Sequence, residues 1–91
     1  MKALNYSAAT NKSGLTAFND SITASSDGVA LVKTGDGSSA SNASVTINNV
    51  IIPKIGNQRG YICTGYIPVR SGDVIAANSS NGASITFIPY V

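Results

Sequence analysis

Short runs of β-branched and apolar residues, separated by turn-forming residues, are the feature that most constrains the fold of this chain. Turn signals recur at Asp27-Gly28, Asn48-Asn49 and Ser71-Gly72-Asp73. The runs follow one another at intervals of roughly 8–12 residues, which is typical of antiparallel sandwiches and barrels and too short for crossover helices. No window keeps the apolar periodicity of an amphipathic helix for more than about two turns. The sequence therefore predicts an all-β fold.

These runs predict about six to eight short strands in a small antiparallel β-sandwich or jelly roll. The expected strands cover residues 21–24, 29–33, 43–47, 50–52, 59–69, 74–77 and 83–91, with loops at 34–42 and 78–82. Asn48-Asn49 suits a tight hairpin, because Asn tolerates a positive φ better than other non-glycine residues. Residues 1–19 interrupt Ala and Leu with polar residues, which predicts an extended N-terminal arm or short strands. A single β-sandwich domain is expected at residues 20–91.

The chain has 91 residues, which allows one small domain whose core alone provides little stability. Small domains are usually stabilised further by disulfides, metals or partner subunits. Cys63 is the single cysteine, so no disulfide forms within one chain, and the sequence contains no His and no Glu. We therefore expect no metal and no cofactor, and association with other subunits is the stabilising device that remains.

Charged residues make up only 11% of the chain, well below the ~25% of an ordinary soluble domain. Ser, Asn, Thr and Gly together account for 38 of the 91 residues. The lysines and arginines are scattered, which argues against nucleic-acid binding. The first residues lack the apolar run of a signal peptide, and no stretch approaches the ~18 apolar residues of a membrane span. We expect a protein that does not insert into membranes and that either folds where it is made or is exported by means that the sequence does not show.

The sequence predicts no catalytic residues. Cys63 has no histidine to act as its base, and a lone cysteine in an apolar strand is usually a small buried side chain. The four carboxylates, Asp20, Asp27, Asp36 and Asp73, all fall in expected turns or loop starts, where Asp commonly caps turns. General acid–base catalysis needs a tunable group. A hydrolase acting on cell-surface polymers is therefore the weakest of the functional hypotheses.

A family resemblance covers about residues 20–91. It rests on Ala24-Ser25-Ser26-Asp27-Gly28-Val29, on Ile67-Pro68-Val69-Arg70-Ser71-Gly72-Asp73-Val74-Ile75, and on the final Ile85-Thr86-Phe87-Ile88-Pro89. This order resembles small jelly-roll modules of bacteriophage structural proteins, which are similar in architecture to trimeric domains of the tumour-necrosis-factor and C1q type. The resemblance implies a virion protein that assembles as a homotrimer. It does not separate one role from another, because fold does not determine function.

Candidate interface residues are aromatic or basic. Tyr is often used where one end of a side chain is buried and the other is wet, and Arg can form inter-subunit hydrogen bonds. The candidates are Tyr61, Tyr66, Arg59, Arg70, Phe87 and Tyr90. For the tyrosines, packing is favoured over stacking on sugar rings. For each arginine alone, a solvated strand end is the simpler interpretation.

Two non-enzymatic functions fit these observations. The first is a trimeric capsid-decoration (cement) protein, made in the host cytoplasm, that binds the major capsid protein or another virion protein and stabilises the phage capsid surface. It is favoured because the sequence is nearly all domain, without a coiled-coil or repeat stalk. The alternative is a tail-fibre or head-fibre tip module that binds a host receptor or surface glycan through the polar loops at 34–42 and 78–82.

Overall fold

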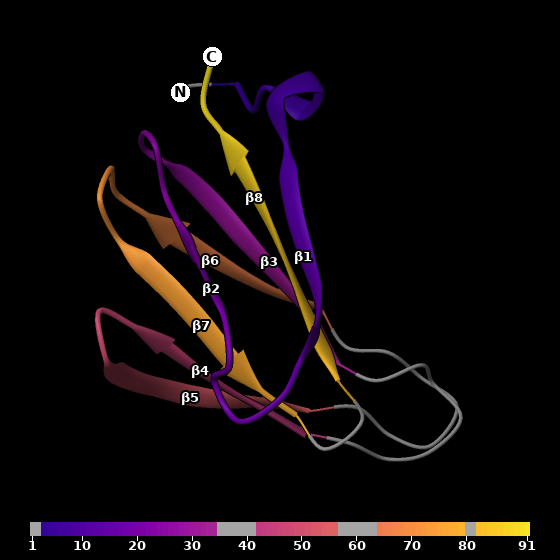
Figure 1. Ribbon diagram of the computed structural model, residues 1–91. Helices are drawn as coiled ribbons and strands as arrows, with labels where there is room; N and C mark the ends of the chain where they lie inside the picture. The colour runs from indigo at the N-terminus through magenta and orange to yellow at the C-terminus, as the bar shows by residue number, and fades with distance from the viewer. Residues whose placement is uncertain (1–2, 35–41, 57–63, 80–81) are drawn as a thin grey trace.

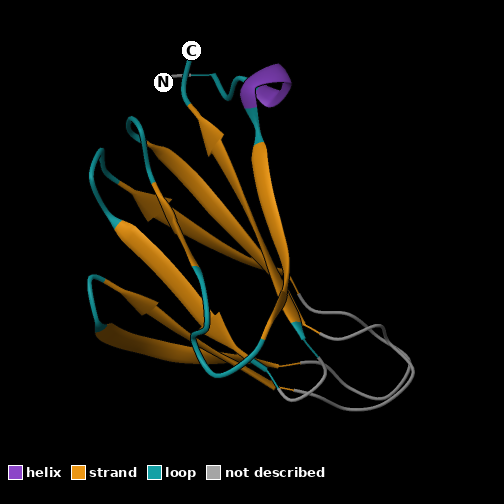
Figure 2. Cartoon of the chain, viewed as in Figure 1, coloured by secondary structure: helices purple, strands orange, loops and turns teal. Residues whose placement is uncertain are grey.

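The computed structural model describes residues 3–34, 42–56, 64–79 and 82–91. These residues form eight strands in two four-stranded sheets, with one short 3-10 helix, η1, at Tyr6–Ala8 (Figures 1 and 2). The strands are β1 (Thr10–Leu15), β2 (Ser21–Thr23), β3 (Gly28–Thr34), β4 (Asn42–Ile47), β5 (Val50–Gly56), β6 (Thr64–Val69), β7 (Val74–Asn78) and β8 (Ala83–Pro89). Within this described part, no helix is long and apolar enough to cross a membrane.

The chain is arranged as one long hairpin that is folded over on itself. β4 pairs with β5, β3 with β6, β2 with β7 and β1 with β8, always antiparallel. In most cross-strand pairs of these four ladders, the sequence numbers of the two paired residues add up to the same value. Thr10 with Phe87 and Ile47 with Val50 are examples. The hairpin therefore keeps one register along its length, apart from one local shift in the β1–β8 ladder and one in the β4–β5 ladder.

The tip of this long hairpin is the turn predicted at Asn48-Asn49. Both residues adopt a positive φ, 52° and 66°. Two consecutive left-handed residues define the type I′ turn, whose twist matches that of the flanking strands. The sequence prediction for this turn is confirmed.

Folding the hairpin over adds two further ladders, β3 with β8 and β4 with β7. The resulting sheet orders are β1-β8-β3-β6 and β2-β7-β4-β5. Eight strands in two packed antiparallel sheets, with this nesting of hairpins, form a jelly roll. The predicted small antiparallel β-sandwich is thus confirmed, and the number of strands is the upper end of the expected range.

The core lies between the two sheets and is built by residues that alternate along the strands. In β8, Ala83, Ile85 and Phe87 are buried, and in β7 Ile75 and Ala77 are buried. Alternation of this kind points every second side chain to the same face. The intervening residues of β7, Val74 and Ala76, face away from the core and form part of the outer surface.

Residues 1–19 do not form a separate arm. β1 lies at the edge of one sheet and pairs with β8, and Leu15 at its end is buried in the core. The alternative of short strands was the better prediction for this segment. The boundary expected at residue 20 falls inside one sandwich, because backbone hydrogen bonding to β8 incorporates the segment into the sheet.

The predicted strand at 59–69 is found in part. β6 covers Thr64–Val69, and residues 57–63 lie outside the described part of the chain. The loop predicted at 34–42 falls largely on residues 35–41, which also lie outside it. The first and last described residues lie side by side, because the Val91 N–H donates to the Ala3 carbonyl oxygen (2.8 Å) and Leu4 forms a bridge with Tyr90 (Figure 1).

Candidate binding groove on the outer face of the β2-β7-β4-β5 sheet

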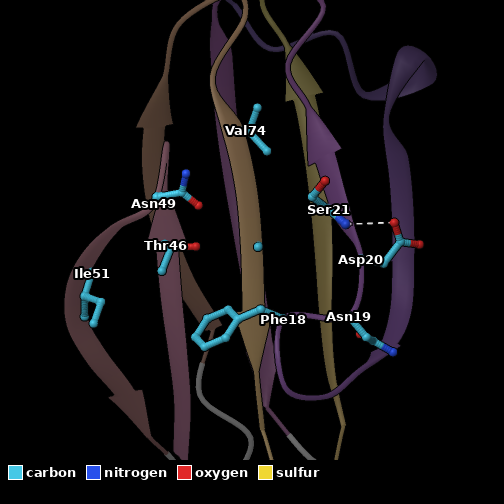
Figure 3. Close-up of a pocket in the computed structure, with 9 residues that line it drawn as sticks. Phe18, Asn19, Asp20, Ser21, Thr46, Asn49, Ile51 and Val74 are labelled. Atoms are coloured by element: carbon cyan, nitrogen blue, oxygen red, sulfur yellow. Dashed lines mark hydrogen bonds between the residues drawn. The ribbon is translucent and has the colours of Figure 1, made fainter.

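A groove of about 600 Å³ lies on the outer face of the β2-β7-β4-β5 sheet (Figure 3). Its floor is β7, one wall is the β4–β5 hairpin, and the other wall is the segment that leads from β1 into β2. The lining residues are Phe18, Asn19, Asp20, Ser21, Thr46, Asn49, Ile51, Val74 and Ala76. The volume lies within the roughly 300–1,000 Å³ that small-molecule sites usually have.

Phe18 is held over the floor of the groove by a strained backbone. Ala17 and Phe18 both have a positive φ, 54° and 55°, a conformation that costs roughly 1–2 kcal/mol per non-glycine residue. Hydrogen bonds to β7 hold the Ala17-Phe18 backbone in this conformation. The Ala17 N–H donates to Asn78 Oδ1 (2.6 Å), and the Phe18 N–H donates to the Ala77 carbonyl oxygen (3.2 Å).

The loop that carries Phe18 is also closed within itself. The Thr16 N–H donates to Asn19 Oδ1 (3.2 Å), and the Asn19 N–H donates to the Thr16 carbonyl oxygen (3.0 Å). The phenyl ring nevertheless stays 41% exposed and points toward the side of Ile51 and Thr46 (Figure 3). The local structure therefore presents an aromatic ring to solvent instead of burying it.

Apolar side chains accompany Phe18 around the groove. Ile51, in the edge strand β5, is 73% exposed, and Val74 on the floor is partly exposed. Ala76 beside it is small, which leaves room above β7. Exposed apolar residues that gather on one face, unlike scattered ones, are a mark of binding surfaces.

The charge at the groove is balanced. Asp20 lies at its rim, and the Lys12 Nζ donates to Asp20 Oδ1 at 2.9 Å. The Ser21 N–H donates to the same oxygen at 2.8 Å, as drawn in Figure 3. The hydrogen bond from Lys12, and then that from Ser21, lower the pKa of Asp20 below its ordinary value. The remaining polar lining groups are the neutral amides and hydroxyls of Asn19, Ser21, Thr46 and Asn49.

Of the residues predicted from sequence as an interface, Arg70, Phe87 and Tyr90 have described side chains, and none of these three lines the groove. Phe87 is 2% exposed and packs in the core, so it offers no surface to a partner. Arg70 is exposed at the end of β6, and Tyr90 is half-buried near the C-terminus. Tyr66 pairs with Leu31 across β3 and β6. Arg59 and Tyr61, like Cys63, lie outside the described residues.

Two hydrogen bonds to Asp27 link the segment that follows Arg70 to the segment that contains Tyr90. The Tyr90 N–H donates to the Asp27 carbonyl oxygen (3.0 Å), and the Ser71 N–H donates to Asp27 Oδ1 (2.9 Å). Asp27 thus ties the turn after β6 to the C-terminal end of β8. Its carboxylate accepts a bond from a turn 44 positions away in the sequence, so this contact is tertiary and does not cap the turn that contains Asp27.

Sequence reasoning missed the groove residues Phe18, Ile51 and Val74. A signal was present for Phe18, which is the single aromatic residue between Tyr6 and Tyr61 and stands in a polar segment. Ile51 follows the Asn48-Asn49 turn, where period-2 alternation leaves open which face is buried. In the described part of the chain, no three His, Cys, Asp or Glu side chains gather in a way that could hold a metal ion.

Together, the strand order and the groove define a jelly-roll β-sandwich with an aromatic-lined groove on one outer face. No protein-family model matches the chain, and no curated protein matches it closely enough to count as a relative.

Proposed function

We propose that this chain is a non-enzymatic structural protein of a virus particle, a trimeric capsid-decoration protein that binds and stabilises the surface of a phage capsid. The observation that carries the proposal is the jelly-roll strand order, β1-β8-β3-β6 packed on β2-β7-β4-β5. Jelly rolls are the fold of many viral capsid domains and lectin domains. Because fold does not determine function, the proposal needs support from residues as well.

The segment Ile67–Ile75, which resembles phage modules, supports it. This segment contains the end of β6, the turn at Ser71-Gly72 and the beginning of β7. It carries the chain from one sheet to the other, because β6 and β7 belong to different sheets. The turn is closed by Asp73, whose Oδ2 accepts the Arg70 N–H at 2.8 Å.

The size and surface of the domain support association. A small domain without a disulfide gains stability from a partner, and the described surface exposes Phe18, Val50, Ile51 and Val74 on or beside one sheet. A standard protein–protein interface buries ~1,600 Å² in total, so trimer formation would contribute a large part of the stability of a chain this small.

Two measurements test this proposal. We expect the protein to form trimers, either free in solution or once bound to capsids. For free trimers, light scattering after size exclusion would give three times the chain mass. We also expect the protein to co-sediment with purified capsids of its phage at a fixed ratio to the major capsid protein, and to raise their resistance to heat. Absence of co-sedimentation at micromolar protein would contradict the decoration role, whatever the mass in solution.

The second candidate is a fibre-tip module that binds a host receptor or surface glycan. The Phe18 groove favours it, because that groove has the size of a small-molecule site and combines an aromatic ring with amide and hydroxyl groups. Retention of the protein on host cells and its loss after removal of their surface polysaccharide would support this role. Equal retention before and after that treatment would count against it.

A further inference from the structure

The Phe18 groove combines three properties that a ligand must match. It offers a partly exposed aromatic ring, it carries neutral hydrogen-bonding groups on both walls, and its one carboxylate, Asp20, is compensated by Lys12 at 2.9 Å. A charged ligand would find no uncompensated opposite charge among the lining residues. A purely apolar ligand would leave the amides and hydroxyls without partners, which is costly when they are desolvated.

We propose that this groove is a subsite for a neutral saccharide unit. A pyranose ring has one face of C–H groups, which stacks on an aromatic ring, and a rim of uncharged hydroxyls, which suit amide and hydroxyl partners. Phe18 supplies the stacking face from one wall, and Thr46 and Asn49 supply polar groups from the other (Figure 3). The inference rests on the second candidate function and goes beyond it by naming the ligand class and the residues.

The rigidity of the Phe18 loop supports a built binding site. Holding two adjacent residues at a positive φ costs free energy, and such strain persists only where the surroundings over-determine it. Here Asn78 and Ala77 of β7 accept the Ala17 and Phe18 N–H groups. A loop whose backbone is fixed before the ligand arrives loses little conformational entropy on binding.

The sheet edges argue against a partner that binds by adding a strand. Edge strands β5 and β6 contain Pro53 and Pro68, which lack a backbone N–H, and edge strand β2 has three residues. At the fourth edge, β1 shifts register between Lys12 and Leu15. Prolines, short strands and irregularities are the devices that block pairing with another chain. A ligand that occupies the groove, without extending the sheet, fits this arrangement.

The test uses the intact chain and an array of neutral oligosaccharides, including glucans, galactans and N-acetylhexosamine polymers, with hits then titrated by NMR. We expect Phe18→Ala to weaken binding of a hit by about tenfold or more, and Phe18→Trp to retain it. Tyr6→Ala is the matched control, because Tyr6 is also an exposed aromatic residue (71%) and lies on η1, outside the groove.

A second pair of variants separates the groove from general surface effects. Ile51→Ser should weaken binding several-fold, and Val50→Ser should not. The two residues are neighbours and both well exposed (Val50 64%), but only Ile51 lines the groove. Because both side chains are exposed, we expect both variants to fold. The dispersion of their amide resonances checks the folding.

Three results would overturn the inference. They are no binding of any neutral oligosaccharide at millimolar concentration, equal binding by all variants, or groove resonances that shift with protein concentration alone, which would assign the groove to a second copy. Co-sedimentation of the same variants with capsids is measured in a separate experiment. A failed saccharide subsite with intact capsid binding therefore leaves the decoration role standing, and host-cell retention without a Phe18 effect leaves the fibre-tip role standing.

Discussion

At the scale of single residues, the described chain contains four non-glycine residues with a positive φ, and they form two adjacent pairs. One pair, Asn48-Asn49, consists of the residue type that tolerates this conformation best. The other pair, Ala17-Phe18, does not consist of such residues, and it lies beside the groove. The contrast indicates that the first pair follows from local sequence and that the second is imposed by hydrogen bonds to β7.

Ala17→Gly should therefore stabilise the protein. Glycine removes the steric cost of the positive φ but increases the entropy of the unfolded chain, so the net gain is expected to be about 0.5–1 kcal/mol. Ala9→Gly is the control, since Ala9 is exposed and extended with a φ of −63°, and that change should destabilise slightly. Urea unfolding measures both, and a lower stability of the Ala17 variant would show that the strain is absent.

Asp73 predicts a response to acid. Its Oδ2 accepts the Arg70 N–H and its Oδ1 accepts from Asn48 Nδ2 (2.9 Å), and these bonds, in that order, lower its pKa below 3.8. A carboxylate whose pKa is lower in the folded state stabilises above its ordinary pKa, and this contribution is lost as pH falls through the lowered value.

We therefore expect Asp73→Asn to unfold more easily at neutral pH, and to lose less stability than the unchanged protein as the pH falls from about 5 through the lowered pKa of Asp73. Melting temperatures across that range measure the difference. The remaining acid dependence in the variant should include Asp20, whose pKa is lowered by Lys12 and Ser21. Parallel curves for the two proteins would exclude Asp73 as a source of the pH dependence.

At the scale of secondary-structure elements, β3 is a central strand, because it pairs with β6 on one side and β8 on the other. Gly28 begins it and pairs with both Val69 and Pro89. A Cβ at this position would collide with the Ile88 carbonyl oxygen. The glycine after Asp27 thus serves close backbone approach between strands, at the point where β3 begins.

Gly28→Ala should destabilise the protein by about 3 kcal/mol, since the colliding atom belongs to a paired strand and cannot move without breaking the ladder. Gly14→Ala is the matched comparison. Gly14 has a φ of 69° but nothing within 4 Å of the added Cβ, so only backbone strain of about 1–2 kcal/mol applies. Guanidinium unfolding of both variants checks the order, and a smaller effect at Gly28 would contradict the close approach.

At the scale of the whole molecule, the folded-over hairpin makes the first and last strands neighbours. β1 pairs with β8, and Leu15 at the end of β1 is 2% exposed within the shared core. The N-terminal segment therefore belongs to the folding unit. Deleting residues 1–15 would remove a strand of the sandwich. A loss of capsid binding in that variant would follow from unfolding alone and would not show that this segment contacts the capsid.

Leu15→Ala is the sharper test of this point. Truncating a buried leucine should cost about 2–5 kcal/mol and lower the single unfolding transition of the whole domain. Val50→Ala, at an exposed position, should change stability by less than about 0.5 kcal/mol. An effect of Leu15→Ala as small as that of Val50→Ala would mean that the N-terminal segment is not part of the core.

The amino-acid sequence by itself determined the class of fold, the approximate places of most strands and the turn at Asn48-Asn49. These depend on local properties, namely period-2 alternation and the tolerance of Asn and Gly for unusual backbone angles. Only the tertiary structure decided that β1 completes a sheet, that Phe87 faces the core, and that Phe18 stands over β7. Each of these depends on contacts between distant parts of the chain. The bond from the Ala17 N–H to Asn78 Oδ1, which joins residues 61 positions apart, has no local pattern that could predict it.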